Sequence, residues 1–243
     1  MKTKLTLFVT VLATALFGVG CSSFQTTETK LKQGLVAYYP FDENAKDESG
    51  KGNDGDVKGA TLAEDRHGKA DSAYSFDGVD DHIYIASSPA LKEMKAVSVS
   101  VWVSVNEKQK VGAHGYNSFV SRWNENNGPV ASFWVGSNEN TRVAADGAPM
   151  HRGQSRTRKE HNISGWLHVT YVHDPAGATL FLNGEHVVNN NVGRNKLNAA
   201  DEPLIIGATR YGEALSQFSN GLIDDIRIYN RALSAEEVKA LYD

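Results

Sequence analysis

Cysteine is almost absent from this chain. Cys21 is the only cysteine among 243 residues, so the protein cannot form an internal disulfide and its stability has to come from a hydrophobic core. Three patterns of common catalytic sites are also missing: the glycine-rich phosphate-binding loop, the His-Glu-x-x-His metal helix and the Gly-x-Ser-x-Gly nucleophile turn. The sequence therefore gives no basis for nucleotide binding, zinc-protease chemistry or serine-hydrolase chemistry.

Positive charge is also in short supply. The formal net charge is −4, and loss of Lys2 and Lys4 with an N-terminal signal would lower it to −6. A mildly acidic body has no general attraction to nucleic acid, so any basic binding patch has to be local. With 40% apolar and 22% charged residues, the composition is that of an ordinary globular domain.

The N-terminus carries an apolar run, Leu5 to Val19, directly after two lysines. Its length suits the core of a signal peptide and is short for a bilayer-spanning helix. The run ends at Gly20-Cys21-Ser22, which resembles the cleavage site of bacterial lipoproteins. The resemblance implies a lipoprotein signal peptide over residues 1–20, palmitate on Cys21 and sorting to the outer membrane. The alternative is a secreted protein with an incidental cysteine.

Residues 21–33 follow this signal and are rich in Ser, Thr, Lys and Gln, without apolar periodicity. Such a composition predicts a flexible tether that holds a domain away from a membrane. Residues 34–243 show no internal repeat, and about 210 residues is an ordinary size for one all-β domain. The sequence therefore predicts a single domain after the tether.

Alternating apolar and polar residues indicate β-strands. Ala96–Val105 alternates five valines with serines and Trp102, so its valine face should lie in the core. Two further strands, Trp166–His173 and Ala178–Asn183, flank the turn sequence Asp174–Gly177 and predict a hairpin.

Two local signals predict the ends of elements. Asn183-Gly184 suits a tight type I′ turn and predicts a second hairpin. Ser234 and Glu237 have the spacing of a capping box, and Val238 and Leu241 follow at helical spacing, so one short C-terminal helix is expected. The remainder alternates strand and loop, which favours a two-sheet antiparallel sandwich.

Several longer segments resemble a known family. Gly221–Val238 resembles the closing strand of bacterial laminin-G-like (concanavalin A-like) jelly rolls, Gly34–Asp42 and Asp47–Gly55 resemble their opening strand and loop, and Ala73–Asp81 resembles the next landmark. The resemblance implies an all-β concanavalin A-like jelly roll over residues 34–243. It does not imply one function, because this sandwich carries lectins, glycosidases, lyases and adhesive modules.

The same resemblance implies a structural calcium ion. In related laminarinases and agarases an aspartate of the closing strand helps to hold calcium, and Asp224 occupies the matching position, with Asp42 and Asp77 as companions. Calcium prefers six to eight oxygen ligands, which such carboxylates supply. The alternative is that Asp42 and Asp77 cap turns and that Asp224 pairs with Arg227 or Lys239.

Aromatic residues beside polar side chains are candidates for a sugar site, because a sugar ring packs on an aromatic face while nearby polar groups bind its hydroxyls. The candidates near a predicted strand end and in two neighbouring segments are Arg122, Trp123, Asn124, Trp134 and Tyr211. The alternative for each aromatic ring is core packing.

Residues 151–161 form a basic run in an otherwise acidic chain, with Arg152, Arg156, Arg158 and a lysine against one glutamate. Arginine matches carboxylates and sulfates, so this run predicts contact with a uronic-acid or sulfated polysaccharide, or with anionic lipid headgroups. A solvated edge strand whose charges prevent aggregation is the alternative.

These patterns predict a non-catalytic cell-envelope module that binds a glycan, with an anionic polysaccharide as the expected ligand. The paired carboxylates of retaining glycosidases, in a Glu-x-Asp-x-x-Glu pattern, do not occur. A polysaccharide lyase of the same fold is one alternative, with His151, Arg156, His168 and Tyr171 as its candidate residues. A module that binds another envelope protein is the other.

Overall fold

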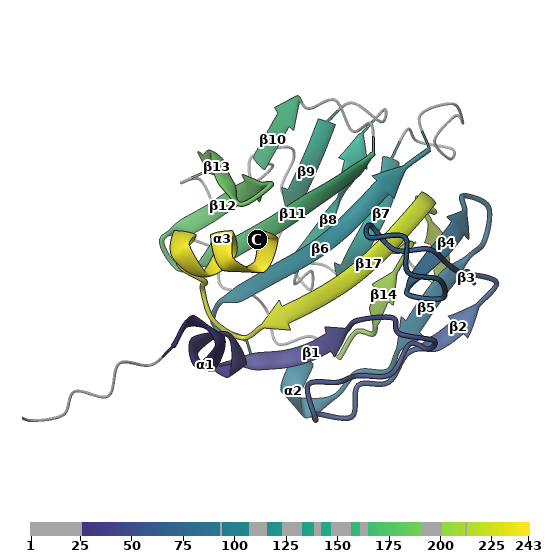
Figure 1. Cartoon of the computed structure of the whole chain (residues 1–243), viewed down its shortest axis with the longest axis horizontal. Helices are drawn as coiled ribbons and strands as arrows, with labels where there is room; N and C mark the ends of the chain where they lie inside the picture. The colour runs from purple at the N-terminus through teal and green to yellow at the C-terminus, as the bar shows by residue number, and fades with distance from the viewer. Residues whose placement is uncertain are drawn as a thin grey trace, which may run out of the picture.

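Two antiparallel sheets pack face to face in the computed structural model, and helices lie at the periphery (Figure 1). The structure describes residues 26–92, 94–106, 116–122, 133–138, 142–146, 157–160, 165–190, 201–211 and 213–243. The predicted signal peptide and Cys21 lie outside these ranges, so the lipid anchor stays a prediction.

The first sheet has eight strands in the order β13-β12-β11-β6-β17-β4-β3, and β1 also pairs with β17. Its strands are β1 (Leu35–Tyr39), β3 (Thr61–Ala63), β4 (Ala73–Asp77), β6 (Val97–Val105), β11 (Trp166–Asp174), β12 (Gly177–Leu182), β13 (Glu185–Asn190) and β17 (Asn220–Tyr229). Each pair in this sheet is antiparallel.

The second sheet has seven strands in the order β10-β9-β8-β7-β14-β5-β2. Its strands are β2 (Asp56–Lys58), β5 (His82–Ile85), β7 (Tyr116–Arg122), β8 (Phe133–Asn138), β9 (Arg142–Asp146), β10 (Thr157–Glu160) and β14 (Leu204–Ile206). A small two-stranded sheet joins β15 (Thr209–Tyr211) to β16 (Ala214–Ser216). This arrangement confirms the predicted two-sheet antiparallel sandwich.

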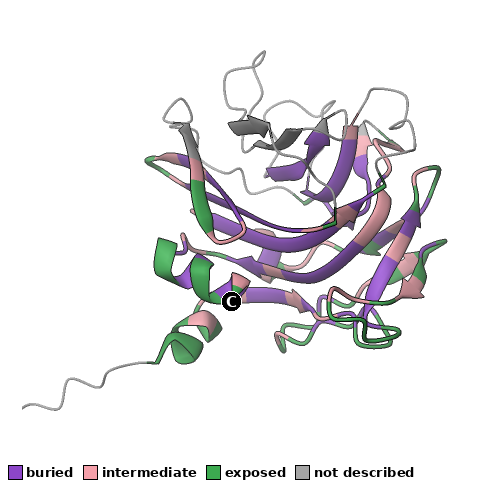
Figure 2. Ribbon diagram, turned by 45° about the horizontal axis from the view of Figure 1, so that its top comes forward, coloured by how far each residue is buried: buried purple, intermediate pink, exposed green. Residues whose placement is uncertain are grey.

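The core lies between the two large sheets, and β6 shows how the sequence places it there. The valines of β6 are all buried, and Val97, Val99, Val101 and Val103 have no exposed surface. The opposite face is buried as well, because Ser98 and Ser100 are at most 1% exposed and Trp102 is 8% exposed. The prediction of a half-buried strand was therefore wrong for the second face, where Tyr242 of α3 stacks on Trp102. The central strands of this sheet are accordingly coloured as buried over most of their length (Figure 2).

Both predicted hairpins are present. Strands β11 and β12 pair from Val169↔Leu182 to Asp174↔Gly177, and the Asp174 carboxylate accepts hydrogen bonds from two backbone N–H groups of the turn. Strands β12 and β13 then meet at Leu182↔Glu185, and Asn183 and Gly184 of this turn have φ values of 50° and 74°. Positive φ at both positions is what the predicted type I′ turn requires.

The C-terminal helix α3 (Ala235–Tyr242) has the predicted capping box, since Ser234 and Glu237 bond reciprocally to each other's backbone. Two further helices correct the prediction of a single one: α1 (Thr27–Lys32) and α2 (Pro89–Lys92). Helix α1 lies within the segment that was expected to be a flexible tether. It is held to the domain because Leu31 packs on the cluster that contains Val238 and Leu241 of α3. In the described part of the chain, no helix is long and apolar enough to cross a membrane.

Arg231 joins α1 to α3. Its guanidinium donates hydrogen bonds to the carbonyls of Lys30 and Gln33, at 2.8 and 2.7 Å, and pairs with Glu237 at 2.7 Å. The Lys30 carbonyl accepts this bond in addition to one from the backbone N–H of Gln33, the C-cap residue of α1, so Arg231 reinforces the end of the helix. Arg231 therefore fixes the first helix to the body of the domain.

We expect Arg231→Ala to lower the free energy of unfolding by about 1–3 kcal/mol, the usual cost of losing hydrogen bonds to a charged group. Urea unfolding monitored by circular dichroism measures this change. Lys32→Ala is the matched control, because its ion pair with Glu28 is exposed and should contribute little. Equal unfolding midpoints for Arg231→Ala and the unmodified protein would contradict the role of Arg231.

Candidate functional site

A bulge in β17 places two neighbouring carboxylates on the outer face of the first sheet. The pairing of β17 with β6 shifts register between Asp224 and Arg227, and Asp225 has a φ of 46°. A bulge of this kind adds an unpaired residue and re-aims its side chain. As a result Asp224 and Asp225, which would alternate between faces in a regular strand, both reach Arg66.

Arg66 binds both carboxylates: its Nη1 lies 2.7 Å from Asp224 Oδ2, and its Nη2 lies 3.2 Å from Asp225 Oδ2. Arg227 Nη2 lies 3.1 Å from Asp225 Oδ1, an ion pair without hydrogen-bond geometry, and donates a hydrogen bond to the Tyr38 hydroxyl. Burial, with the nearby Asp225 charge, raises the pKa of Asp224 to about 7, although Arg66 acts in the opposite direction. Two guanidiniums therefore face two carboxyl groups in this network.

An aromatic pocket opens beside this network. It has a volume of about 270 Å³ and is lined by Arg66, His67, Trp102, Trp166, Leu241, Tyr242 and Asp243. Trp102 contacts two other residues of the pocket. The Tyr242 ring stacks on the Trp102 ring with 5.6 Å between ring centres, and the Arg66 guanidinium lies 4.6 Å from the centre of the Trp102 ring. Trp166 and Tyr242 are only partly buried, so their rings are the accessible aromatic walls. This aromatic pocket is the candidate functional site.

Two buried nitrogen atoms near the aromatic pocket have no hydrogen-bond partner among the described residues: Trp102 Nε1 and His168 Nδ1. The two rings lie 5.0 Å apart. Burial, followed by the charges of Arg227 and Arg66, lowers the pKa of His168 to about 3, so this histidine is neutral at pH 7. Its Nε2 lies 2.7 Å from the Ser100 hydroxyl, and the side chain has a packing role.

A larger groove lies on the other side of Leu241. It has a volume of about 770 Å³ between α1, α3, β1 and β17, and Leu241 lines both this groove and the aromatic pocket. Leu31, Leu35 and Tyr38 contribute its apolar surface. Its charged lining residues are Glu28, Lys32, Glu48, Lys51 and Arg227. The aromatic pocket therefore has a groove beside it that is nearly three times its volume.

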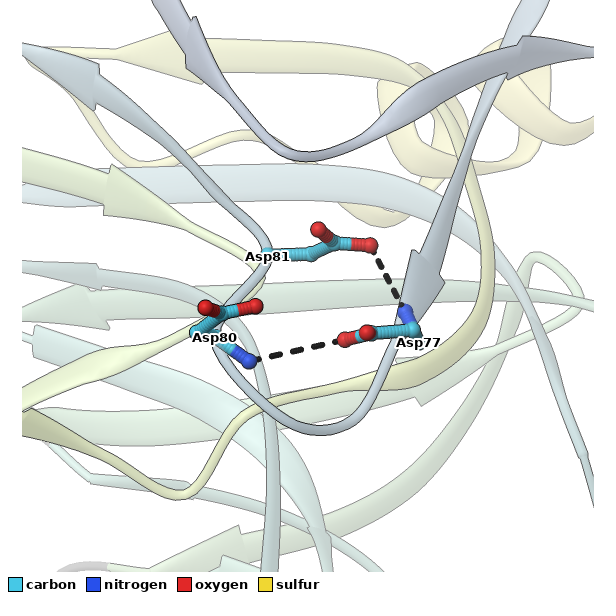
Figure 3. A group of neighbouring side chains, drawn as sticks. All are labelled: Asp77, Asp80 and Asp81. Carbon is cyan, nitrogen blue, oxygen red and sulfur yellow. Dashed lines mark hydrogen bonds between the residues drawn. The ribbon is translucent and has the colours of Figure 1, made fainter.

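A separate acidic turn follows β4, where Asp77, Asp80 and Asp81 bring carboxylate oxygens within 4.8 Å of one another (Figure 3). Asp81 accepts a hydrogen bond from the backbone N–H of Asp77, and Asp77 accepts one from the N–H of Val79. Burial and the two neighbouring carboxylates raise the pKa of Asp81. Three carboxylates suit the donor preference of calcium, and they also stabilise the turn through these hydrogen bonds.

The predicted calcium set of Asp42, Asp77 and Asp224 does not come together in the described structure. Asp42 pairs with Lys69, and Asp224 pairs with Arg66 rather than with Arg227 or Lys239. A guanidinium 2.7 Å from a carboxylate repels a cation, so Asp224 is a poor calcium ligand. Of the three predicted calcium ligands, only Asp77 belongs to the acidic turn, where it lies close to Asp80 and Asp81.

Two of the predicted sugar-binding residues are buried. Arg122 is 1% exposed and its Nε donates a hydrogen bond to the carbonyl of Glu202, while burial lowers its pKa to about 10. Trp134 is 6% exposed and its indole N–H bonds to the Ser118 hydroxyl at 2.6 Å. Neither side chain offers an open surface to a sugar, which corrects their predicted role.

The other predicted glycan-binding residues fall where no side chain is described. Arg158 lies in β10, the edge strand of the second sheet, and Tyr211 lies in β15. Four more lie outside the described residues altogether: Trp123, Asn124, Arg152 and Arg156. The roles of these six residues stay predictions.

The described members of the predicted lyase set do not form an open catalytic site. His168 is 1% exposed on the outer face of β11, and Tyr171 is fully buried in the core on the opposite face. The Tyr171 hydroxyl lies 2.9 Å from His173 Nδ1. The remaining candidates, His151 and Arg156, lie outside the described residues.

The aromatic pocket was missed at the level of sequence, although part of the signal was there. Trp102 interrupts the serines of β6, which marks the face away from the core as apolar at one point. Trp166 begins the adjacent strand and lies opposite Ser104, while His168 lies opposite Trp102. Tyr242 and Arg66 had no such signal, because they reach the pocket from distant parts of the chain.

Comparison with solved structures finds the same fold in several proteins, two of which were solved with a sugar. Domain 4 of AbnA, a GH43 extracellular arabinanase from Geobacillus stearothermophilus solved with arabinotriose, has a TM-score of 0.63 at 19% identity, covering 86% of this chain and 98% of that one. The botulinum neurotoxin serotype D binding domain with N-acetylneuraminic acid scores 0.66 at 14%, covering 89% and 52%. The binding domain of Paraclostridial Mosquitocidal Protein 1 scores 0.66 at 17%, covering 87% and 52%. This chain thus spans about half of each toxin domain.

Comparison with curated protein sequences gives no match. At identities below 20%, the solved structures show a shared fold and no more. A family model does match, over residues 77–239, from the acidic turn to the last helix. That range is most of the chain and includes the closing strand with Asp224 and Asp225. The protein is a laminin-G-like member of the concanavalin A-like lectin/glucanases superfamily.

Proposed function

We propose that this protein is a non-catalytic recognition module that binds a glycan at the aromatic pocket. The observation that carries the proposal is the pairing of two partly exposed rings, Trp166 and Tyr242, with polar side chains in one concave site. Sugars bind to such sites through ring packing and a few hydrogen bonds. Similar folds with arabinotriose and with N-acetylneuraminic acid support a glycan as the ligand class.

The carboxylates beside the pocket support binding rather than hydrolysis. A glycosidase needs two carboxyl groups that reach the two sides of the scissile bond. Asp224 is only 2% exposed, Asp225 is 8% exposed, and both are held by Arg66. In this arrangement they position Arg66 against Trp102 and are not presented to a substrate.

The first test replaces Tyr242, one of the two accessible aromatic residues of the pocket. We expect Tyr242→Ala to weaken glycan binding by about tenfold, which corresponds to about 1.4 kcal/mol of lost ring packing. Tyr242 is the last residue of α3, so the fold should persist. Isothermal titration against the best ligand from a glycan array measures the effect.

Tyr84→Ala is the matched control, because Tyr84 is 40% exposed and lies on β5 of the other sheet. It should bind the glycan as the unmodified protein does. An unchanged affinity in Tyr242→Ala would remove the aromatic pocket from the site. Release of shortened or unsaturated saccharides by the unmodified protein would show that it is an enzyme and would contradict the proposal of a non-catalytic module.

Binding of an anionic polysaccharide is a finer proposal, for a contact other than the aromatic pocket, and it rests on the basic run at residues 151–161. We expect the double variant Arg156→Ala/Arg158→Ala to lose affinity for an oligogalacturonate while its melting temperature stays unchanged, since charges on a surface segment, as this run is predicted to be, contribute little stability. Binding assays at low and high salt measure the electrostatic part. The same affinity in both proteins would exclude this run from the ligand site.

We also propose that calcium binds at the acidic turn of Asp77, Asp80 and Asp81. Calcium should raise the melting temperature of the unmodified protein, because it relieves repulsion among three close carboxylates and binds only the folded state. Differential scanning calorimetry with calcium and with chelator measures this shift. Asp80→Asn should lose it, whereas Asp42→Asn, whose carboxylate pairs with Lys69, should keep it. If only Asp42→Asn lost the calcium-dependent rise in melting temperature, the result would contradict a site at the acidic turn and favour the ligand set predicted from the sequence, Asp42, Asp77 and Asp224.

A further inference from the structure

The aromatic pocket and the larger groove adjoin each other at α3. Leu241 of α3 lines both hollows. The side-chain network links them a second time, because Asp225 pairs with Arg66 in the pocket and with Arg227 in the groove. Two independent contacts thus connect the hollows between α3 and β17.

The volumes of the two hollows leave room for a ligand larger than one sugar unit. At about 270 Å³ the pocket lies just below the range of about 300–1,000 Å³ that is usual for ligand sites. The adjoining groove, at about 770 Å³, lies within that range. One sugar unit in the pocket would therefore have room for further units beside it.

Charge indicates that this ligand is neutral. Arg66 and Arg227 are already matched by Asp224 and Asp225 through ion pairs. At the groove, Lys32 pairs with Glu28, and Lys51 shares the lining with Glu48. Counted together with Asp224 and Asp225, carboxylates balance the cationic side chains of the described lining, so the site has no strongly cationic surface that would favour a uronate or sulfate over uncharged hydroxyl groups.

The groove also offers the right contacts for a sugar chain. The Tyr38 ring is partly exposed, and the Arg227 guanidinium lies 4.4 Å from its centre, which holds the ring in place. Ser49 and Asn230 add hydroxyl and amide groups to the lining. A fixed aromatic ring with nearby neutral polar groups is suited to packing and hydrogen bonding of a sugar.

We propose that the aromatic pocket and the groove form one extended site for a neutral oligosaccharide, with one sugar unit between Trp166 and Tyr242 and the following units beside Tyr38. This inference rests on the proposed glycan-binding function and deepens it. Within the basic run, the described residues Thr157–Glu160 form β10 of the second sheet, whereas Trp102 and Trp166 of the pocket belong to the first sheet.

The test is a titration series on the full chain. The ligands are neutral linear arabino- and gluco-oligosaccharides of one to six units, with oligogalacturonates of the same lengths as the anionic comparison. For the neutral series, affinity should rise with length by about tenfold or more before it levels off. It should change little between low and high salt, because uncharged ligands are not screened.

Three variants locate the two parts of the site. Tyr242→Ala should weaken every length, whereas Tyr38→Ala should weaken only the longer chains and leave the shortest unchanged. Since Tyr38 also contacts Arg227, Ser49→Trp serves as a second variant that fills the groove without removing this contact. Tyr84→Ala, on the other sheet, should behave like the unmodified protein in every titration.

Each outcome separates this inference from the proposed function. Affinity that does not depend on length, or that is unchanged in both Tyr38→Ala and Ser49→Trp, would overturn the extended site while glycan binding stands. Binding of oligogalacturonates alone, with a steep loss in high salt, would overturn the neutral ligand. Failure of every saccharide to bind would instead overturn the proposed function.

Discussion

The bulge in β17 is the constraint on which this face of the molecule depends. Strand β17 pairs with β6 along one side and with β4 and then β1 along the other, so it crosses the middle of the first sheet. The register shift at Asp224 and Asp225 occurs where the partner changes from β4 to β1. It directs both carboxyl groups to the outer face, where Arg66 joins them and packs over Trp102.

The energetic role of this network is positioning more than stabilisation. Burying ion pairs costs desolvation energy that their attraction offsets only in part. The pKa of Asp224, raised to about 7 despite an arginine at 2.7 Å, is consistent with that balance. The network instead fixes Arg66 against Trp102 and Arg227 against Tyr38. It thereby shapes the aromatic pocket on one side and the groove on the other.

Features that depend on local sequence were predicted well. The valine face of β6, both hairpins and the capping box of α3 each follow from residues a few positions apart. The helix α1 was not predicted, because its stability comes from Leu31 packing on α3 and from Arg231, about 200 residues further along the chain. The composition of a short segment does not predict a contact with residues so far away in the sequence.

The candidate site was predicted less well for the same physical reason. Arg122 and Trp134 are the right residue types for a sugar site, but the fold buries both. Asp224 matched a calcium ligand in sequence, yet its partner is Arg66, which lies 158 positions away. The pocket itself is built from a loop, two strands and the last turn of α3. Residue type indicates possible chemistry, whereas tertiary packing decides which side chains meet.

The most direct measurement is a nuclear magnetic resonance titration that follows the indole N–H signals of the four tryptophans with a neutral oligosaccharide, such as arabinotriose. We predict that the signals of Trp166 and Trp102 shift with the ligand, because both line the aromatic pocket. The signal of Trp134, buried in the second sheet, should remain in place. A shift of the Trp134 signal, with those of Trp102 and Trp166 unchanged, would contradict the account and move the sugar site to the second sheet.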